Sequence, residues 1–174
     1  RSSEVGDPLF YDVPVDQLLS NMRTKELSSS INLKKASKAS IVKPIEVINE
    51  SRDTTHYSII DSYGNAVSNT YTLGASFGSG VTIPGTGILM NNQMNNLVYK
   101  SGDVSKMGRR VSPGNKFQPG KRPMSTMAPV MVFNENNELA LITGSPGGSY
   151  IPAAILRVIS GVIDFNLPIG EATM

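Results

Sequence analysis

Apolar positions near the start of the chain follow the spacing of a helix. After Pro14, apolar residues recur with the i, i+3, i+4, i+7 pattern at Val15, Leu18, Leu19 and Met22. This spacing places them on one face and predicts a short amphipathic helix. The segment 28–44 that follows is rich in Ser and Lys and has little apolar pattern, so it predicts an exposed connector.

Beyond residue 54 the pattern becomes that of strands. Residues 55–61 and 65–73 are rich in β-branched and aromatic side chains, and residues 62–65 form a turn sequence between them. A tight turn centred on residues 63–64 would place Thr54 opposite Leu73. Thr72 would then lie directly beside Thr54, and a slip of one residue would keep this neighbourhood.

A second hairpin and a helix follow further along the chain. Residues 129–133 and 139–143 flank the polar segment 134–138, which predicts two strands and a turn. The glycine-rich segment 144–149 then leads into 151–165, where one helical face carries Ile151, Ile155, Val158, Ile159 and Val162. This order places backbone N–H groups at a helix N-terminus.

Composition narrows the chemistry that this chain can perform. Its 174 residues have a formal net charge of +2, a single His (His56) and no Cys. Disulfides, a thiol nucleophile and Cys-ligated or multi-His metal sites are therefore excluded. The near-neutral charge gives no reason to expect nucleic acid as a partner, and no apolar run is long enough to span a membrane.

The junction between the polar segment and the first strand contains a candidate nucleophile. A cut between Asp53 and Thr54 would free the α-amine of Thr54. With an ordinary pKa of about 7.7–8.0, that amine can accept the hydroxyl proton without help from a His. The alternative is a Thr that merely starts a strand, and His56 is expected to be a packed or hydrogen-bonded imidazole.

Three further groups have both a chemical and a structural explanation. Gly147 and Gly148 could direct two N–H groups at an oxyanion, or form only a tight strand-to-helix turn. The hydroxyls of Ser125 and Thr126 could bind a substrate carboxylate, or cap a local turn. The amide-rich segment 91–96 could hold polar substrate groups, or cap a strand end.

The order and spacing of several motifs is more specific than any one of them. The motifs are TTHYS at 54–58, GNAV at 64–67, TYTL at 70–73, GILMNNQM at 87–94, KRPMSTM at 121–127 and TGSPGGS at 143–149. Together they closely resemble the γ-glutamyltranspeptidase family over nearly the whole chain. Upstream, residues 6–8 and 13–16 are similar to the end of that family's large subunit.

The resemblance implies a fold and a division into subunits. The implied fold is α+β, the four-layer αββα sandwich of N-terminal nucleophile hydrolases, made as one precursor that cuts itself before a Thr. Residues 1–53 would end the large subunit, and residues 54–174 would begin the small catalytic subunit. We expect the chain to be a fragment that spans this junction, with the sandwich incomplete.

The resemblance also implies roles for individual residues. The cut falls between Asp53 and Thr54, and Thr54 is the nucleophile of both self-cleavage and acyl transfer. Thr72 supports this nucleophile, and Gly147 and Gly148 form the oxyanion hole. The positions that bind the donor are Gln93, Asn96, Ser125 and Thr126.

Three positions depart from the family pattern. Gly74 replaces the usual Asn, Asn96 replaces an acidic residue that faces the donor's α-ammonium, and Met107 replaces a lid Tyr. Loss of a carboxylate beside a buried ammonium removes a charge-assisted hydrogen bond of about 1.5–3 kcal/mol. These departures leave the choice of donor open.

The function implied by the resemblance is γ-glutamyl transfer or hydrolysis on glutathione and related amides. Water, an amino acid or a dipeptide would be the acceptor, and no metal or organic cofactor is expected. One alternative keeps the mechanism but takes glutaryl-type donors without an α-ammonium, and another is a non-catalytic homologue that keeps the scaffold. The rest of the large subunit is the expected partner, and the family favours a periplasmic or secreted location.

Overall fold

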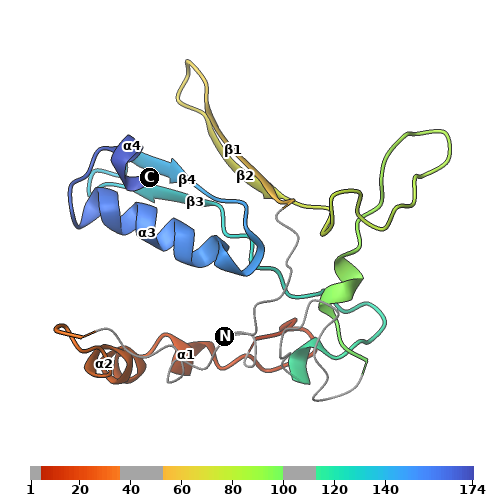
Figure 1. The fold of residues 1–174 in the computed structure, drawn as a ribbon, viewed down its shortest axis with the longest axis horizontal. Coiled ribbons are helices and arrows are strands. Elements are labelled where there is room, and N and C mark those ends of the chain that lie inside the picture. The colour runs from red at the N-terminus through yellow and green to blue at the C-terminus, as the bar shows by residue number, and fades with distance from the viewer. Residues whose placement is uncertain (1–4, 36–52, 100–112) are drawn as a thin grey trace. The chain divides into compact units, whose positions relative to one another are not determined.

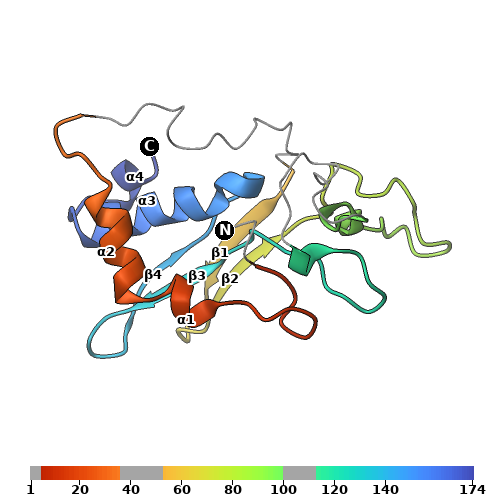
Figure 2. The ribbon, with the colours of Figure 1, turned by 90° about the horizontal axis from the view of Figure 1, so that it is seen from below.

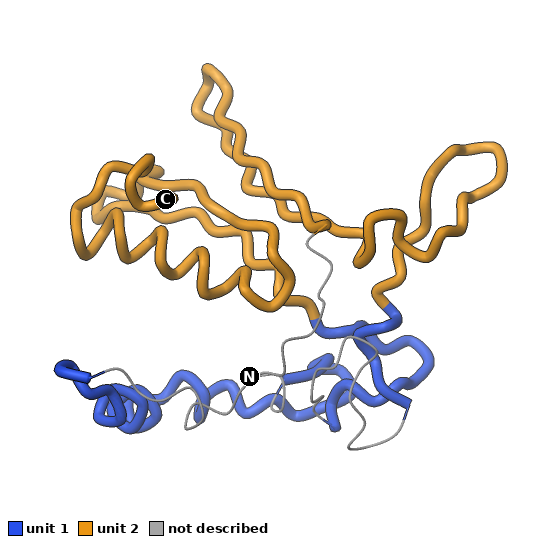
Figure 3. Tube along the Cα trace, viewed as in Figure 1, with its two compact units in different colours: residues 1–49, 94–124 blue, residues 50–93, 125–174 orange. Residues whose placement is uncertain are grey.

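The computed structural model describes residues 5–35, 53–99 and 113–174. They belong to two units, residues 1–49 with 94–124 and residues 50–93 with 125–174, which are coloured separately in Figure 3. The second unit combines two antiparallel hairpins with a long helix (Figure 1), an α+β arrangement. The connector residues 36–44 and the lid position Met107 lie outside the described residues.

The first hairpin of the second unit forms where the sequence predicts it. β1 (Thr55–Ile60) pairs antiparallel with β2 (Ala66–Tyr71). Its register differs from the prediction by one residue, because Thr55 lies opposite Tyr71. Continued by one position, the ladder sets Thr54 opposite Thr72, so the expected pairing with Leu73 is wrong.

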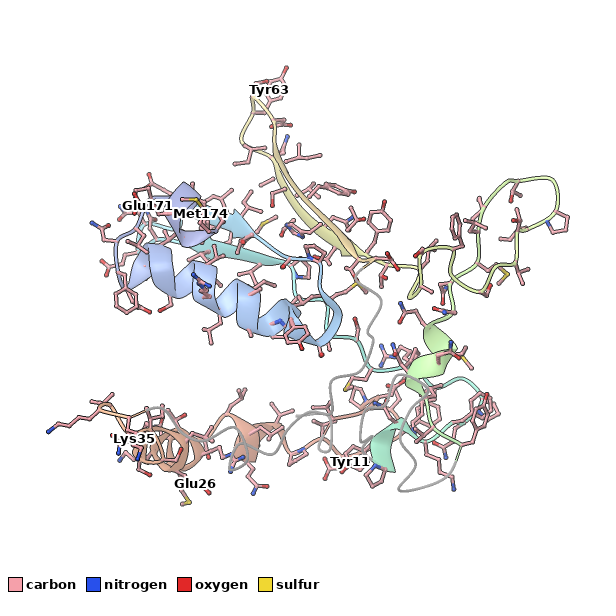
Figure 4. The ribbon with its side chains drawn as sticks, viewed as in Figure 1. Tyr11, Glu26, Lys35, Tyr63, Glu171 and Met174 are labelled. Atoms are coloured by element: carbon pink, nitrogen blue, oxygen red, sulfur yellow. The ribbon has the colours of Figure 1, made fainter. Side chains whose placement is uncertain are left out.

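The turn of this hairpin explains the shift in register. Asp61 N–H donates to Asn65 O at 3.0 Å, which closes a loop of three residues instead of two. The Asp61 carboxylate stabilises the loop, since its Oδ1 accepts from the N–H groups of Tyr63 (2.9 Å) and Asn65 (2.8 Å). Gly64 has a φ of 83°, as a glycine in this type of loop requires. Tyr63 lies at the exposed tip of the hairpin (Figure 4).

The second hairpin is confirmed and meets the first. β3 (Val130–Phe133) pairs antiparallel with β4 (Leu139–Thr143). Ser68 Oγ of β2 donates to Thr143 O of β4 at 3.2 Å. Next to it, a β-carbon built on Gly144 would collide with the ring of His56. The two hairpins therefore contact each other closely at this glycine.

A helix follows the second hairpin and is positioned by a glycine turn. The 3₁₀ turn η3 (Gly148–Tyr150) runs directly into α3 (Ile151–Ile163), which lies along the β3–β4 hairpin (Figure 1, Figure 2). Ile151 and Ile155 are buried, which confirms the apolar face expected from the sequence. α3 ends at Ile163, two residues earlier than predicted. α4 (Ile169–Ala172) then packs back on α3, where Ala172 Cβ lies 3.0 Å from the point that a β-carbon on Gly161 would occupy.

The glycine-rich segment after β2 is a loop that folds back on itself. Ser79 N–H donates to Met90 O and Met90 N–H donates to Val81 O, each at 2.8 Å. Thr82 and Leu89 form an isolated antiparallel bridge within the same loop. The 3₁₀ helix η1 (Gln93–Asn96) follows it.

The predicted N-terminal helix is divided in two. α1 (Val15–Leu18) ends before Ser20, and α2 (Asn21–Ser29) begins after it. Ser20 has an extended backbone and its Oγ accepts from Arg23 N–H at 3.1 Å, so it caps α2 and prevents one continuous helix. None of the residues of α1 and α2 is buried. The start of the predicted connector, residues 28–29, is helical.

A short basic segment packs against the N-terminal residues in the first unit. The 3₁₀ helix η2 (Pro113–Asn115) touches Gly6, where a β-carbon would lie 2.8 Å from Gly114 O. Lys121 is buried and its Nζ donates to Lys116 O at 3.0 Å. The same Nζ lies 5.5 Å from the centre of the Phe10 ring. The Lys121 side chain is therefore packed against backbone and an aromatic ring and is not exposed to solvent.

Candidate active site

Thr54 lies at the entrance of β1 in the second unit and is half-buried. Residues in direct opposition across an antiparallel ladder have their β-carbons about 4.5–5.5 Å apart and point to the same face. The last pair of the ladder is Thr55 with Tyr71, and one further step in the same register would set Thr54 opposite Thr72. Asp53, which precedes Thr54, accepts a hydrogen bond at Oδ2 from Ser76 Oγ at 2.7 Å.

Thr72 lies in a tight turn that follows β2. Its Oγ1 accepts a hydrogen bond from Gly74 N–H at 2.9 Å. A hydroxyl that accepts this bond keeps its own proton for donation to a second group. Gly74 has a φ of 94°, a conformation that suits glycine.

The amide-rich segment lies across this turn. Asn92 N–H donates to Leu73 O at 2.8 Å, which ties the segment to the end of β2. Asn91 Oδ1 accepts from Gln93 N–H at 3.0 Å and so caps the start of η1. Gln93 Nε2 lies 3.4 Å from the position that a β-carbon on Gly74 would occupy. Asn91 therefore caps a helix start, whereas the side chains of Asn92 and Gln93 lie near Gly74.

The glycine turn before α3 has a left-handed backbone at both of its glycines. Gly147 has a φ of 120° and Gly148 a φ of 56°. The first N–H groups of a helix have no partner within it, and here they belong to the turn that starts the η3–α3 segment. Tyr150 N–H donates to Gly147 O at 3.0 Å and orients the turn.

The hydroxyl groups of Ser125 and Thr126 make different hydrogen bonds. Thr126 Oγ1 donates to Gly148 O at 2.8 Å, which links the pair directly to the glycine turn. Ser125 Oγ accepts from Met127 N–H at 3.1 Å, and the Ser125 side chain is exposed. Asn96 belongs to the first unit, where its Nδ2 donates to Met124 O at 3.3 Å.

His56 has a structural environment, as expected. Its Nδ1 lies 2.7 Å from Thr70 Oγ1 and its Nε2 lies 3.0 Å from Ser58 Oγ. A neutral imidazole satisfies both contacts, since one ring nitrogen donates and the other accepts. Burial lowers the pKa of His56 below its usual value, which favours this neutral form.

The structure thus joins the candidate residues in two clusters. One contains Thr72, the Gly74 backbone and the amides at 92–93, and the other contains Thr126 and Gly148. Among the described residues, no hydrogen bond links Thr54 to Thr72 or to either glycine of the turn. Within the amide segment 91–96, the sequence does not single out Asn92, whose side chain lies over Gly74 in the structure. Its signal was Gly74, since a glycine at the end of a strand often marks a close approach.

Two further properties concern the described residues as a whole. No three His, Asp or Glu side chains in the described ranges group closely enough to hold a metal ion. Of the helices in the same ranges, none has the length and apolar character needed to cross a membrane.

The chain matches one family along its whole length. The model of a family described as Gamma-glutamyltranspeptidase matches residues 1–174. The chain is 40% identical over 174 residues to the glutathione hydrolase proenzyme of Escherichia coli (strain K12), and the match covers 99% of this chain and 30% of that protein. It is 35% identical over 172 residues to the acylase ACY 1 proenzyme of Pseudomonas sp. (strain SE83), with 99% and 28% covered.

The fold is also similar to a solved structure. The crystal structure of an acivicin-inhibited gamma-glutamyltranspeptidase has a TM-score of 0.62 and 47% sequence identity, and the match covers 68% of this chain and 62% of that chain. This chain therefore belongs to the gamma-glutamyltranspeptidase family. It spans about 30% of the length of the curated relatives described above.

Proposed function

We propose that this chain is part of a γ-glutamyl acyl transferase or hydrolase that cuts itself between Asp53 and Thr54. The observation that carries the proposal is the register of the first hairpin: Thr55 pairs with Tyr71, so one further step along the ladder would set Thr54 opposite Thr72. Family membership supports it, because relatives are glutathione hydrolase proenzymes. Residues 1–53 would then end the large subunit, and residues 54–174 would begin the small one.

Cleavage would give Thr54 its own general base. In the uncut chain the nitrogen of Thr54 is an amide, which does not accept a proton near neutral pH. A freed α-amine has an ordinary pKa of about 7.7–8.0 and takes the proton from Thr54 Oγ during attack. In the cleaved enzyme the Thr72 hydroxyl, which accepts from Gly74 N–H, would donate its proton to Thr54 Oγ and orient it.

The first reaction step transfers the acyl group to the enzyme. Thr54 Oγ attacks the γ-carbonyl carbon of the donor, and the carbonyl oxygen becomes an oxyanion. The N–H groups of Gly147 and Gly148 stabilise this charge from their positive-φ turn. The C–N bond then breaks, the leaving amine takes the proton from the α-amine, and a γ-glutamyl ester remains on Thr54.

The second step resolves this ester. Water, or the amine of an amino acid or dipeptide, attacks the ester carbon and gives up a proton to the α-amine of Thr54. The ester bond between Thr54 Oγ and the acyl carbon then breaks, Thr54 Oγ takes the proton back from the α-ammonium, and glutamate or the transfer product is released. This reaction calls for no metal or organic cofactor, because each proton moves between groups that the enzyme or its substrates supply.

The donor would be held by polar side chains around the two clusters. Ser125 and Thr126 would donate hydroxyl protons to the α-carboxylate, and the contact of Thr126 with Gly148 supports this position beside the oxyanion turn. Gln93 and Asn96 would contact the α-amino group of a γ-glutamyl donor. The rest of the large subunit would complete a four-layer αββα sandwich, to which the two hairpins and α3 contribute.

The proposal is tested by the intact mass of the protein expressed from its complete gene. Two polypeptides are expected, the smaller of which begins at Thr54. Thr54→Ala should abolish both cleavage and turnover of γ-glutamyl-4-nitroanilide. A single wild-type chain that stays uncut and inactive would favour the non-catalytic alternative, and processing that survives Thr54→Ala would contradict Thr54 as nucleophile.

A second candidate keeps the mechanism and changes the donor. An acylase for glutaryl-type amides is favoured by the neutral Asn96, which has no charge to attract an α-ammonium, and by the relative named acylase ACY 1 proenzyme. The cleaved enzyme should then hydrolyse glutaryl-4-nitroanilide faster than γ-glutamyl-4-nitroanilide. The opposite preference would rule this candidate out.

A further inference from the structure

The side chain of Asn92 lies directly over the backbone of Gly74. A β-carbon built on Gly74 would collide with Asn92 Oδ1 and would lie 3.2 Å from Asn92 Cγ. Gly74 also has a φ of 94°, at which any residue with a side chain is strained. Glycine at this position therefore provides the space that the Asn92 carboxamide occupies.

Backbone contacts fix this arrangement beside Thr72. Asn92 N–H donates to Leu73 O at 2.8 Å, and Gly74 N–H donates to Thr72 Oγ1 at 2.9 Å. The backbone of Asn92 is thus bonded to Leu73, and its carboxamide lies over Gly74. Its position depends on the same turn that holds the Thr72 hydroxyl.

The carboxamide of Asn92 is half-buried and available. Among the described residues it neither donates nor accepts a hydrogen bond. A carboxamide offers two donors and one acceptor, and a partly desolvated amide gains stability from a partner. Gln93 Nε2 lies 3.4 Å from the same point over Gly74, so the ends of two neighbouring amides meet there.

We propose that Asn92 is a specificity-determining residue that binds the polar end of the acyl donor through its carboxamide. The inference rests on the proposed function, because it takes Thr54 and Thr72 as the catalytic pair. A neutral carboxamide can donate to a carboxylate and accept from an ammonium, but it adds no charge that would favour the ammonium. Asn92 therefore tolerates donors with and without an α-ammonium.

The test compares two donors on the cleaved enzyme produced from the complete gene. Asn92→Ala should raise KM for γ-glutamyl-4-nitroanilide about five- to tenfold, the effect of one lost hydrogen bond, with kcat changed less than about threefold. Asn92→Asp, which is nearly isosteric, should raise the kcat/KM ratio of γ-glutamyl to glutaryl anilide about tenfold, because a carboxylate would then face the ammonium. Asn136→Ala is the matched control, since Asn136 is exposed in the β3–β4 turn, and it should change neither quantity.

A third variant tests the contact itself. Gly74→Ala should displace the Asn92 side chain and shift KM in the same direction as Asn92→Ala, and the double variant should show less than the sum of the two effects. If Asn92→Ala fails to fold, the nearly isosteric Asn92→Asp decides alone.

The outcomes separate this inference from the proposed function. A wild-type enzyme that is neither cleaved nor active overturns both. A cleaved, active wild type whose KM and donor ratio stay within about twofold in the Asn92 variants overturns only the inference about Asn92.

Discussion

Asp7 and Arg122 form a multiply hydrogen-bonded ion pair across 115 positions of the sequence. Asp7 Oδ1 accepts from Arg122 Nη2 at 2.7 Å, and Oδ2 accepts from Arg122 Nε at 3.1 Å and from the backbone N–H of Arg122 at 2.8 Å. The Asp7 side chain is fully buried, whereas the Arg122 side chain is exposed. Cleavage before Thr54 would leave this pair as a link between the two polypeptides.

Asp7→Asn should lower the thermal stability of the protein most strongly near neutral pH. The hydrogen bonds from Arg122 hold the pKa of Asp7 well below its usual value. The unfolded state therefore binds the proton first as the pH falls, so the stabilisation is complete above the unfolded pKa of about 3.9 and decreases below it. Unfolding temperatures of wild type and Asp7→Asn should differ at pH 7 and converge as the pH is lowered through 4 and below.

An exposed ion pair provides the control for this measurement. Arg23 Nη1 and Glu26 Oε2 lie 3.0 Å apart on the surface of α2. Exposed pairs contribute about 0–1 kcal/mol, so Glu26→Gln should change the unfolding temperature little at any pH. An equal effect of the two substitutions would contradict the role of burial at Asp7.

Thr72→Val should lower kcat with little change in KM. The substitution preserves the shape of the side chain but removes the hydroxyl that accepts from Gly74 N–H and that we propose orients Thr54. Positioned proton-handling groups contribute about 100-fold or more, so kcat should fall by about that factor. Steady-state kinetics should show KM changed less than about threefold, and Thr72→Ser should restore most of the activity.

Gly147→Ala and Gly148→Ala should damage the reaction more than their backbone strain explains. Alanine keeps its backbone N–H, but strain at a positive φ would turn that N–H away from the oxyanion, and loss of one oxyanion donor typically lowers kcat by about 100- to 1000-fold. The strain of a positive φ, 120° and 56° at these residues, adds about 1–3 kcal/mol of destabilisation. Gly85 also has a positive φ, 77°, but lies in an open loop, so Gly85→Ala should show comparable strain with an unchanged kcat. Equal kcat values in all these variants would refute the oxyanion role.

Gly144→Ala should loosen the contact between the two hairpins. The added methyl group would collide with the His56 ring, and overpacking of this kind costs about 1–3 kcal/mol. The pKa of His56, now lowered by burial, should move up toward about 6.5 when the ring becomes more exposed. Denaturant unfolding and NMR titration of the single His measure the two effects. Gly170→Ala, in α4 with open space around it, should leave both unchanged within about 0.5 kcal/mol.

The local pattern of apolar and polar residues was sufficient to predict most strands and the long helix of the second unit. β1, β2, β3 and β4 lie where alternating and β-branched residues predict strands, and α3 buries Ile151 and Ile155 of its apolar face. These elements are encoded within ten to fifteen residues, so the sequence signals them directly. The glycine turn before α3 is equally local, because positive φ at Gly147 and Gly148 depends on the absence of a β-carbon.

The sequence pattern gave the wrong helix length and the wrong strand register at two places, and at each a side-chain to backbone hydrogen bond made the difference. Ser20 caps α2 and interrupts the apolar helical pattern around it. Asp61 closes a three-residue loop, which shifts the register by one and exchanges Leu73 for Thr72 opposite Thr54. Both alternatives satisfy the same apolar pattern, and the difference lies in side-chain to backbone bonds that the pattern does not report.

By itself, the sequence determined the family, the order of strands and helix, and the residue types available for chemistry, because these depend on local periodicity and on motif spacing. Tertiary structure alone decided which distant residues meet. Three contacts join segments that share no pattern along the chain. They are the Asp7–Arg122 ion pair, the close packing of His56 on Gly144 and the packing of Asn92 over Gly74. Such contacts arise from packing in three dimensions, where burial and hydrogen bonding select partners regardless of their separation in sequence.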